Sequence, residues 1–261
     1  MIGSSEPWSG GAHSPRLRCV LAPNPSPMTL DGTNTWVIGT GPYAVVDPGP
    51  DDAVHLAAIV DAADGRIAHI LLTHGHPDHA EGAQTLHEMT GGPVRALDPR
   101  HVLGGEGLSA DSEVAAGDVA VRVIATPGHT SDCLSFYVSD DGAILTGDTV
   151  LGRGTTVVAW PDGHLGDYLA SLRELRRLAE QWEALALLPG HGPVLPDPVG
   201  VIDAYLQHRQ ARLEQVRLAW DAGRRTPEQI VDEVYVDIPD HVRWAALLST
   251  RAQVEYLEGG A

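Results

Sequence analysis

The 261-residue chain contains no lysine, one phenylalanine and two cysteines. All 17 basic residues are therefore arginine, and 35 acidic residues outnumber them to give a formal net charge of −18. Such an acidic chain repels nucleic-acid backbones at long range, so a broad nucleic-acid-binding surface is disfavoured. The two cysteines, Cys19 and Cys133, are too few for a disulfide framework, and their spacing fits no zinc ribbon.

Long apolar runs are also missing. No stretch approaches the roughly 18–20 apolar residues that a membrane-spanning helix needs, and the first residues lack the apolar segment of a secretory signal. These absences predict a soluble, cytoplasmic protein without a membrane partner. The composition, with 43% hydrophobic residues, 29 Gly and 19 Pro, is that of a globular protein and excludes collagen-like or disordered chains.

Short β-rich runs alternate with helical patterns over most of the chain. The expected strands are 18–21, 35–39, 44–47, 69–73, 94–96, 119–125, 134–138, 143–146 and 184–188. The expected helices are 51–63, 80–89, 167–182, 201–220, 228–234 and 242–257. Strands therefore dominate the first 198 residues, and only helices are expected after them.

This change of pattern predicts three parts. Residues 1–15, rich in Gly, Ser and Pro, are expected to be a flexible leader, and residues 16–198 a catalytic domain. Residues 199–261 are expected to form a long helix plus a small helical C-terminal domain. The net charge is −15 over residues 1–200 and only −3 over residues 201–261. We expect the appendage to serve packing or oligomerisation, for example in a homodimer.

The segment after the 69–73 strand carries four ligand-type side chains within six positions. On an extended backbone His74 and His76 point the same way, so they can share one metal ion. Pro77 favours the start of a helix, which would turn Asp78 and His79 toward a second point nearby. One histidine at such a turn is more often structural, but four ligand-type residues favour a metal site.

Three later segments repeat the design, in which an apolar strand ends in a small-residue turn. These turns present His129, Asp148 and His191, each next to a glycine that lets the backbone approach a buried ion. A single catalytic zinc takes about three protein ligands, so seven ligands suit two ions. His74, His76 and His129 would hold one ion. Asp78, His79 and His191 would hold the other, with Asp148 between them. Imidazole and carboxylate donors without thiolate favour two Zn²⁺, and Mn²⁺ or Fe would also suit them.

The chain resembles the metallo-β-lactamase superfamily. Its H-x-H-x-D-H motif is residues 74–79, the later His, Asp and His follow in the right order, and residues 45–49 match the strand-end Asp-x-Gly turn of that fold. The resemblance covers residues 16–198. It implies an α/β fold, the four-layer αββα sandwich, with a dinuclear site at one edge.

Two further stretches, residues 24–35 and 205–209 with Arg212, are similar to the beta-lactamase-like protein 2 group, close to the glyoxalase II hydrolases. That resemblance implies a small winged-helix-like domain from about residue 226. The acidic tail, without lysine or an evident β-wing, departs from a DNA-binding winged helix.

The expected function is metal-dependent hydrolysis. A metal-bridging hydroxide would attack a carbonyl-type substrate such as a thioester, ester or amide. Weak β-lactamase activity would not be surprising, although the chain lacks the lysine with which zinc β-lactamases commonly hold the drug carboxylate. The alternative is an endoribonuclease that cuts single-stranded RNA with the same site, which the net charge disfavours. A non-catalytic metal-binding interaction module is less favoured, because the ligand set is complete.

Roles beyond ligation are also expected. Asp78 and Asp148 are the candidate catalytic carboxylates, and Asp78 could help to orient the hydroxide. Asp47 is expected to position the site loops by hydrogen bonds. The residues expected to support the site or to line the substrate cleft are Thr130, Arg153, Trp160, His208 and Arg209, with Arg212 beside them as a further basic residue.

Overall fold

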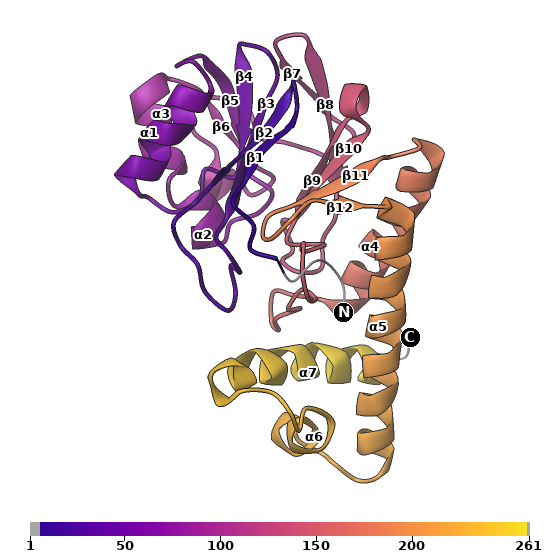
Figure 1. Ribbon diagram of the computed structural model, residues 1–261. Helices are drawn as coiled ribbons and strands as arrows, with labels where there is room; N and C mark the ends of the chain where they lie inside the picture. Colours follow the sequence, from indigo (N-terminus) through magenta and orange to yellow (C-terminus); the bar gives the residue numbers. More distant parts are fainter. Residues whose placement is uncertain (1–5, 260–261) are drawn as a thin grey trace.

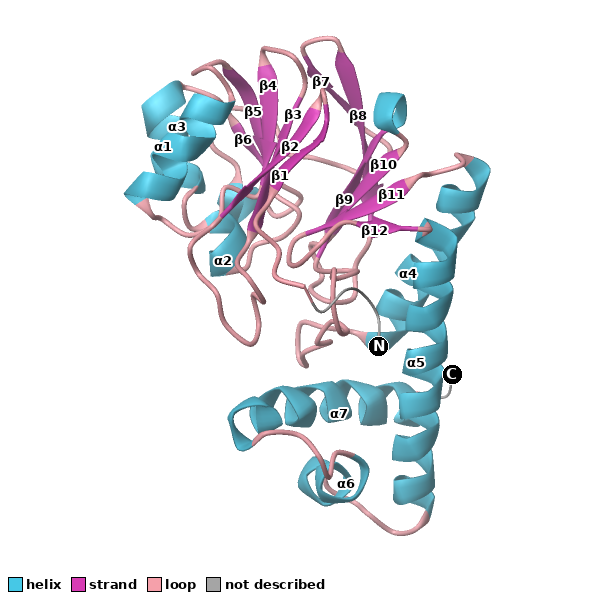
Figure 2. Cartoon of the chain, viewed as in Figure 1, coloured by secondary structure: helices cyan, strands magenta, loops and turns pink. Residues whose placement is uncertain are grey.

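Two six-stranded sheets pack face to face between outer helices (Figure 1). This computed structural model describes residues 6–259. Helices cover the outer face of each sheet, and the strands lie together in the middle (Figure 2). The predicted αββα sandwich is therefore confirmed.

The first sheet has the strand order β1-β2-β3-β4-β5-β6. Its strands are β1 (Gly11–Ser14), β2 (Leu17–Leu21), β3 (Asn34–Ile38), β4 (Tyr43–Val46), β5 (Ile67–Leu71) and β6 (Val94–Arg95). Its helices are α1 (Ala53–Ala62), α2 (Pro77–Ala80) and α3 (Ala83–Thr90). β4, β5 and β6 run parallel because α1 and the α2–α3 segment carry the chain back between them.

The second sheet has the order β12-β11-β10-β9-β8-β7. Its strands are β7 (Glu113–Ala116), β8 (Val119–Ala125), β9 (Leu134–Val138), β10 (Ala143–Gly147), β11 (Ala186–Pro189) and β12 (Leu195–Pro196). Its outer helices are α4 (Leu165–Gln181) and α5 (Pro198–Asp221). β10 and β11 are parallel because α4 connects them.

Three apolar layers hold the sandwich together. Trp36 and Phe136 belong to the layer between the sheets, Leu56 to the layer under α1 and α3, and Tyr168 to the layer under α4 and α5. Each of these side chains is at most 2% exposed. Burial on both faces explains why β9 and β10, in which every residue is buried, are largely apolar instead of alternating.

The C-terminal part consists of α5, α6 (Pro227–Val234) and α7 (Arg243–Glu258), with a small core that includes Val216 and Ile230. Figure 1 shows α7 lying across α5 below the sandwich. The helices predicted for this part are present. Residues 198–259 contain no strand, so the likeness to a winged-helix domain is not confirmed. None of the helices in the described range 6–259 is long and apolar enough to cross a membrane.

The N-terminal segment differs from the expected flexible leader. β1 pairs antiparallel with β2, and the Trp8 indole donates a hydrogen bond to Asn34 Oδ1 at 2.8 Å. Trp8 also packs against the core between the sheets. Residues 6–15 are therefore part of the fold as described, whereas residues 1–5 lie outside the described residues. The sequence also did not predict β7 and β12, because these edge strands are short or interrupted by proline.

Candidate metal centre

The seven predicted ligands converge at one edge of the sandwich, where four strands end. β5 leads into His74, His76, Asp78 and His79, β8 into His129, β10 into Asp148, and β11 into His191. Pro77 is the first residue of α2, as predicted, and this short helix turns Asp78 and His79 toward His191. Residues that are as much as 117 positions apart therefore meet in space.

Three imidazoles form the first group. His74 Nε2 lies 3.0 Å from His76 Nδ1, which is 3.1 Å from His129 Nε2. The opposite nitrogens of two rings are occupied, since His74 Nδ1 donates to Thr73 Oγ1 at 3.0 Å and His129 Nδ1 to the Val157 carbonyl at 2.7 Å. The nitrogens of His74 and His129 that face the group are therefore free to bind a cation.

The second group consists of Asp78, His79 and His191. The Nε2 atoms of His79 and His191 are 3.1 Å apart, and Asp78 Oδ2 lies 3.2 Å from His191 Nε2 and 3.6 Å from His79 Nε2. His79 Nδ1 donates to Asp47 Oδ2 at 2.8 Å, and His191 Nδ1 donates to the Gly32 carbonyl at 3.2 Å. The Nδ1 hydrogen bond of each ring thus fixes its orientation, as is usual for metal-binding histidines.

Asp148 lies between the two groups. Its Oδ1 is 3.4 Å from the Nε2 atoms of both His79 and His191, and its Oδ2 is 3.7 Å from His129 Nε2. Oδ1 is buried without a hydrogen-bond partner among the described residues. A carboxylate that reaches both groups is placed to hold them at a fixed separation.

The charges of the second group are balanced internally. Burial would raise the pKa of Asp148, but His191 and His79 hold it well below its usual value. Burial would lower the pKa of His191, but Asp148 raises it to about 9, and the pKa of His79 is likewise raised. In the first group, burial lowers the pKa of His74 and His129. A cation in the second group would therefore displace protons from its histidines.

The donor set fits metal ions. Tetrahedral zinc with bonds of about 2.0–2.1 Å separates its nitrogen ligands by roughly 3.3 Å. The observed nitrogen separations of 3.0–3.1 Å are close to this value. The unpartnered Asp148 Oδ1 is the kind of buried acceptor that a cation would satisfy. Histidine and aspartate clusters that could hold a metal are thus present. Two of them are the groups expected from the sequence, and a third, formed by His74, His79 and Asp148, connects them.

Gly190 gives the centre room at the end of β11. A Cβ atom at this position would lie 2.7 Å from His79 Cε1 and 2.8 Å from Asp148 Oδ1. We therefore expect Gly190→Ala to displace a ligand and to lower both the bound metal per chain and the hydrolysis rate by at least about tenfold. Gly166→Ala is the matched control, because its Cβ would meet only Tyr256 at 3.4 Å. Metal analysis of both variants tests this, and a fully metallated, active Gly190→Ala would contradict it.

The loop after Asp148 is held by α4 and α5. The Leu151 N–H donates to the Tyr205 hydroxyl at 2.8 Å, and this hydroxyl donates to the Leu151 carbonyl at 3.2 Å. Tyr168 donates to the Thr149 carbonyl at 2.7 Å, and Arg209 donates to the Thr156 carbonyl. These contacts make α5 a structural support of the metal centre.

Removing one hydroxyl tests this support. We expect Tyr205→Phe to lower the free energy of unfolding by about 1–3 kcal/mol, since the buried Leu151 N–H loses its acceptor. Urea unfolding measures the change. In Tyr43→Phe, which removes an exposed hydroxyl near Asp64, the loss should stay within about 0.5 kcal/mol. Equal losses in the two variants would show that the Tyr205 hydroxyl does not support the loop.

The remaining predicted residues have different surroundings. Thr130 is buried and donates to Asp132 Oδ1 at 2.6 Å, and Arg153 pairs with Asp31 and donates to the Glu6 carbonyl. Trp160 is 38% exposed, and Arg251 lies 5.8 Å from its ring centroid. Both Arg153 and Trp160 thus have protein partners. His208 and Arg209 line a separate pocket together with Arg212.

Four orienting groups were not identified from the sequence. Asp47, which was predicted, accepts hydrogen bonds from both the backbone N–H and the hydroxyl of Thr73, at 2.8 and 2.7 Å. Thr73 then accepts from His74, so one residue connects Asp47 to the first group. Thr73 could have been suspected from its place next to the motif. The carbonyls of Gly32 and Val157 carry no sequence signal, and Tyr205 was noted only as part of the 205–209 stretch, without this role.

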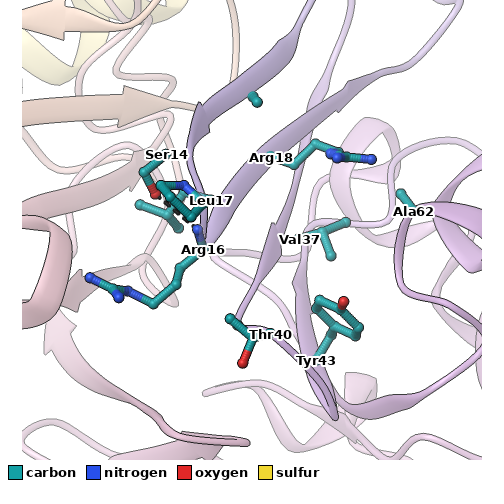
Figure 3. A pocket seen from close by; sticks show the side chains of 11 residues that line it. Ser14, Arg16, Leu17, Arg18, Val37, Thr40, Tyr43 and Ala62 are labelled. Carbon is teal, nitrogen blue, oxygen red and sulfur yellow. Dashed lines mark hydrogen bonds between the residues drawn. The ribbon is translucent and has the colours of Figure 1, made fainter.

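A further pocket lies on the first sheet, away from the metal centre. This pocket of about 380 Å³ is lined by Arg18, Val37 and Tyr43, among others (Figure 3). Its lining includes none of the predicted site residues. It is therefore separate from the metal centre.

The sequence model of the metallo-beta-lactamase superfamily matches residues 28–191, more than half of the chain. The chain belongs to the metallo-β-lactamase superfamily. As a member of this superfamily, the protein is a metal-dependent hydrolase.

Relatives of this superfamily hydrolase cover most of its length. A Caenorhabditis elegans protein named beta-lactamase-like protein 2 homolog is 32% identical over 256 residues, which are 91% of this chain and 82% of the relative. An Aspergillus fumigatus protein named atrochrysone carboxyl ACP thioesterase is 34% identical over 228 residues, 84% of this chain and 69% of the relative. The resemblance inferred from the motifs is confirmed.

The fold of this superfamily member is also found in a solved structure. The crystal structure of a beta-lactamase domain protein from Burkholderia ambifaria superposes with a TM-score of 0.80 at 23% identity, covering 98% of this chain and 91% of the other. At this identity the likeness shows the fold alone. The match over nearly the whole chain includes the C-terminal helices.

Proposed function

We propose that this metallo-β-lactamase superfamily hydrolase cleaves acyl thioesters with two bound metal ions, for which zinc is the ion the donor set favours. The observation that carries the proposal is the position of Asp148, whose two oxygens face different groups of ligands. His74, His76 and His129 would hold one ion, and Asp78, His79 and His191 the other, with Asp148 shared by both.

The chain's own residues prepare the reaction. When bound, a pair of divalent cations polarises the substrate carbonyl and makes water a nucleophile near neutral pH. Asp78 is the more exposed of the two carboxylates, with a side chain 31% exposed against 12% for Asp148. Asp78 would therefore orient the attacking water on the open side. Asp148, on the buried side, would hold the two groups of ligands at a fixed separation.

The cleavage needs no covalent enzyme intermediate. Cys133 follows His129 by four residues in the chain, and burial raises its pKa to about 12, so its thiol stays protonated and unreactive. Water would supply the oxygen that joins the acyl carbon, the carbon–sulfur bond breaks, and the departing thiolate takes up a proton. The products are a carboxylic acid and a thiol.

The choice of a thioester rests on the relatives and on charge. One relative that covers 84% of this chain is named as a thioesterase that acts on an acyl group carried by an ACP. The net charge of −18 opposes the close approach of a polyanion such as RNA. A small acyl thioester meets no comparable repulsion.

A parallel assay on purified protein of known metal content tests the proposal. The substrates are an acyl thioester, a short single-stranded RNA and a chromogenic β-lactam. We expect two metal ions per chain and a kcat/KM for the thioester that exceeds the β-lactam value by at least about a hundredfold. RNA cleavage with an inert thioester would instead make the protein a nuclease. One metal ion per chain at full activity would refute the dinuclear site.

A further inference from the structure

A pocket of about 250 Å³ lies between the loop after Asp148 and the C-terminal helices. One wall carries His208, Arg209 and Arg212, all from α5. None of the residues that line it is acidic, in a protein with 35 acidic residues. The pocket is therefore a local basic site on a strongly acidic chain.

The two arginines are not neutralised by the protein. Several other arginines pair with carboxylates, as Arg176 does with Asp203 and Arg217 with Glu214. Within residues 6–259, no carboxylate lies within the 4.0 Å ion-pair distance of Arg209 or Arg212. Arg209 is only 8% exposed, and its Nε is buried without a hydrogen-bond partner. A buried guanidinium without a counter-ion favours an anion beside it.

The Arg212 guanidinium is fixed by the protein and keeps N–H donors that make no hydrogen bond within the described chain. Its guanidinium lies 4.2 Å from the Tyr235 ring centroid, and Nη1 donates to the Val234 carbonyl at 2.9 Å. A guanidinium has five N–H donors, and this is the one hydrogen bond that Arg212 makes within the described chain. The remaining donors of this fixed group can bind the oxygens of an anion.

The other wall of the pocket is apolar. Val157 comes from the loop after Asp148, and Ile238, Val242, Ala245 and Ala246 come from the C-terminal part. One side of this small pocket can bind the oxygens of an anion, and the other side can contact hydrocarbon. Such a pocket suits a ligand in which an anionic group lies next to a branched hydrocarbon.

This pocket adjoins the metal centre through the loop itself. Val157 lines the pocket, and its carbonyl accepts the hydrogen bond from His129 Nδ1. Thr156, also in the lining, donates to the Asp148 carbonyl at 2.6 Å. A long substrate with its anion in the pocket could therefore extend toward the metal ligands.

We propose that this pocket binds the phosphate and the neighbouring gem-dimethyl carbon of a 4′-phosphopantetheine arm, a proposal that rests on the thioesterase function proposed above. This arm carries the acyl thioester in both coenzyme A and acyl carrier proteins. Its phosphate would lie against Arg212 and His208, near the charge of Arg209. Its two methyl groups would lie against Val157 and the α7 alanines.

Binding to the metallated protein tests the pocket directly. The probes are the S-methyl thioethers of 4′-phosphopantetheine and of pantetheine, which differ by one phosphate and have no thiol to bind a metal. We expect isothermal titration to show at least about tenfold tighter binding of the phosphorylated probe. Arg212→Gln should remove most of this difference. Arg217→Gln, on the same helix but outside the pocket and paired with Glu214, should keep it.

A second variant guards against a folding defect. If Arg212→Gln lowers the melting temperature, His208→Ala, which removes an exposed ring from the same wall, replaces it in the comparison. Equal binding of the two probes to the unmodified protein would overturn the proposal. So would equal losses in the Arg212 and Arg217 variants, or Arg212-dependent binding of a short single-stranded RNA that excludes the phosphorylated probe.

Turnover assays distinguish a failure of the pocket proposal from a failure of the proposed thioesterase function. Acetyl-phosphopantetheine should have a kcat/KM at least about tenfold above that of acetyl-pantetheine, and Arg212→Gln should reduce this ratio. Acetyl-coenzyme A and an acetylated carrier protein present the same arm from its two sources. If Arg212→Gln lowers kcat/KM for either of these two substrates, the result supports binding of the arm in the pocket. If it changes kcat/KM for neither, the proposal is overturned. Hydrolysis of neither arm thioester, with the binding difference intact, would refute the thioesterase function alone.

Discussion

Asp148→Ala is expected to lower the hydrolysis rate by at least about a thousandfold, equivalent to ~4 kcal/mol of activation free energy. Asp148 Oδ1 lies 3.4 Å from two histidine nitrogens of the second group, and Oδ2 lies 3.7 Å from His129 of the first. The variant therefore loses the carboxylate that connects the two groups. Steady-state kinetics and metal analysis on the same sample measure the loss, and bound metal should fall below two ions per chain.

A matched variant makes this test decisive. Asp51→Ala removes an exposed aspartate outside the metal centre and should leave rate and metal content unchanged. Circular dichroism should show that both variants are folded, because Asp148 follows the end of β10 and belongs to none of the apolar layers. Unchanged turnover in folded Asp148→Ala would refute a mechanism that uses both groups of ligands.

Asp47→Asn is expected to lower metal affinity by about 10–100-fold without touching a ligand. Oδ1 of Asp47 accepts from the Thr73 N–H, and Oδ2 accepts from the Thr73 hydroxyl and from His79 Nδ1. An asparagine offers one oxygen and turns an N–H₂ group toward these donors, so His79 loses its orientation. Competition with a chelating dye measures the affinity.

The same variant should also be less stable when free of metal. At least one buried donor loses its acceptor, which lowers the free energy of unfolding by about 1–3 kcal/mol. Asp47 has a φ of 54°, a left-handed conformation that asparagine tolerates, so backbone strain should not add to the loss. Asp61→Asn, an exposed position on α1, is the control. Equal metal affinity in the two variants would mean that Asp47 does not orient His79.

Much of the fold could be predicted because its signals are local. β9 and β8 match the predicted ranges 134–138 and 119–125, and the six longest helices lie where the patterns placed them. The flexible leader was wrong for residues 6–15. Glycine and serine there suggested freedom, but Trp8 and β1 gain hydrogen bonds and burial from partners far along the chain.

The substrate-lining residues were harder to predict than the ligands. Ligands are restricted to a few side-chain types at strand ends, so their positions can be read from the sequence. The surroundings of an arginine depend on which acids the fold brings near it. Arg153 pairs with Asp31, whereas Arg209 and Arg212 meet no carboxylate among residues 6–259. The fold therefore makes Arg153 part of a structural ion pair and leaves Arg209 and Arg212, which line a pocket, as candidates for binding an anion.

The sequence by itself determined the identity and order of the metal-ligand candidates, because these follow from residue type and short-range periodicity. The sandwich that carries them was implied by the resemblance of these motifs to the superfamily. The tertiary structure decided how the ligands are oriented. The carbonyls of Gly32 and Val157 and the carboxylate of Asp47 select the nitrogen with which His191, His129 and His79 face the centre. Every residue has a carbonyl, so only folding determines which one accepts a given histidine proton.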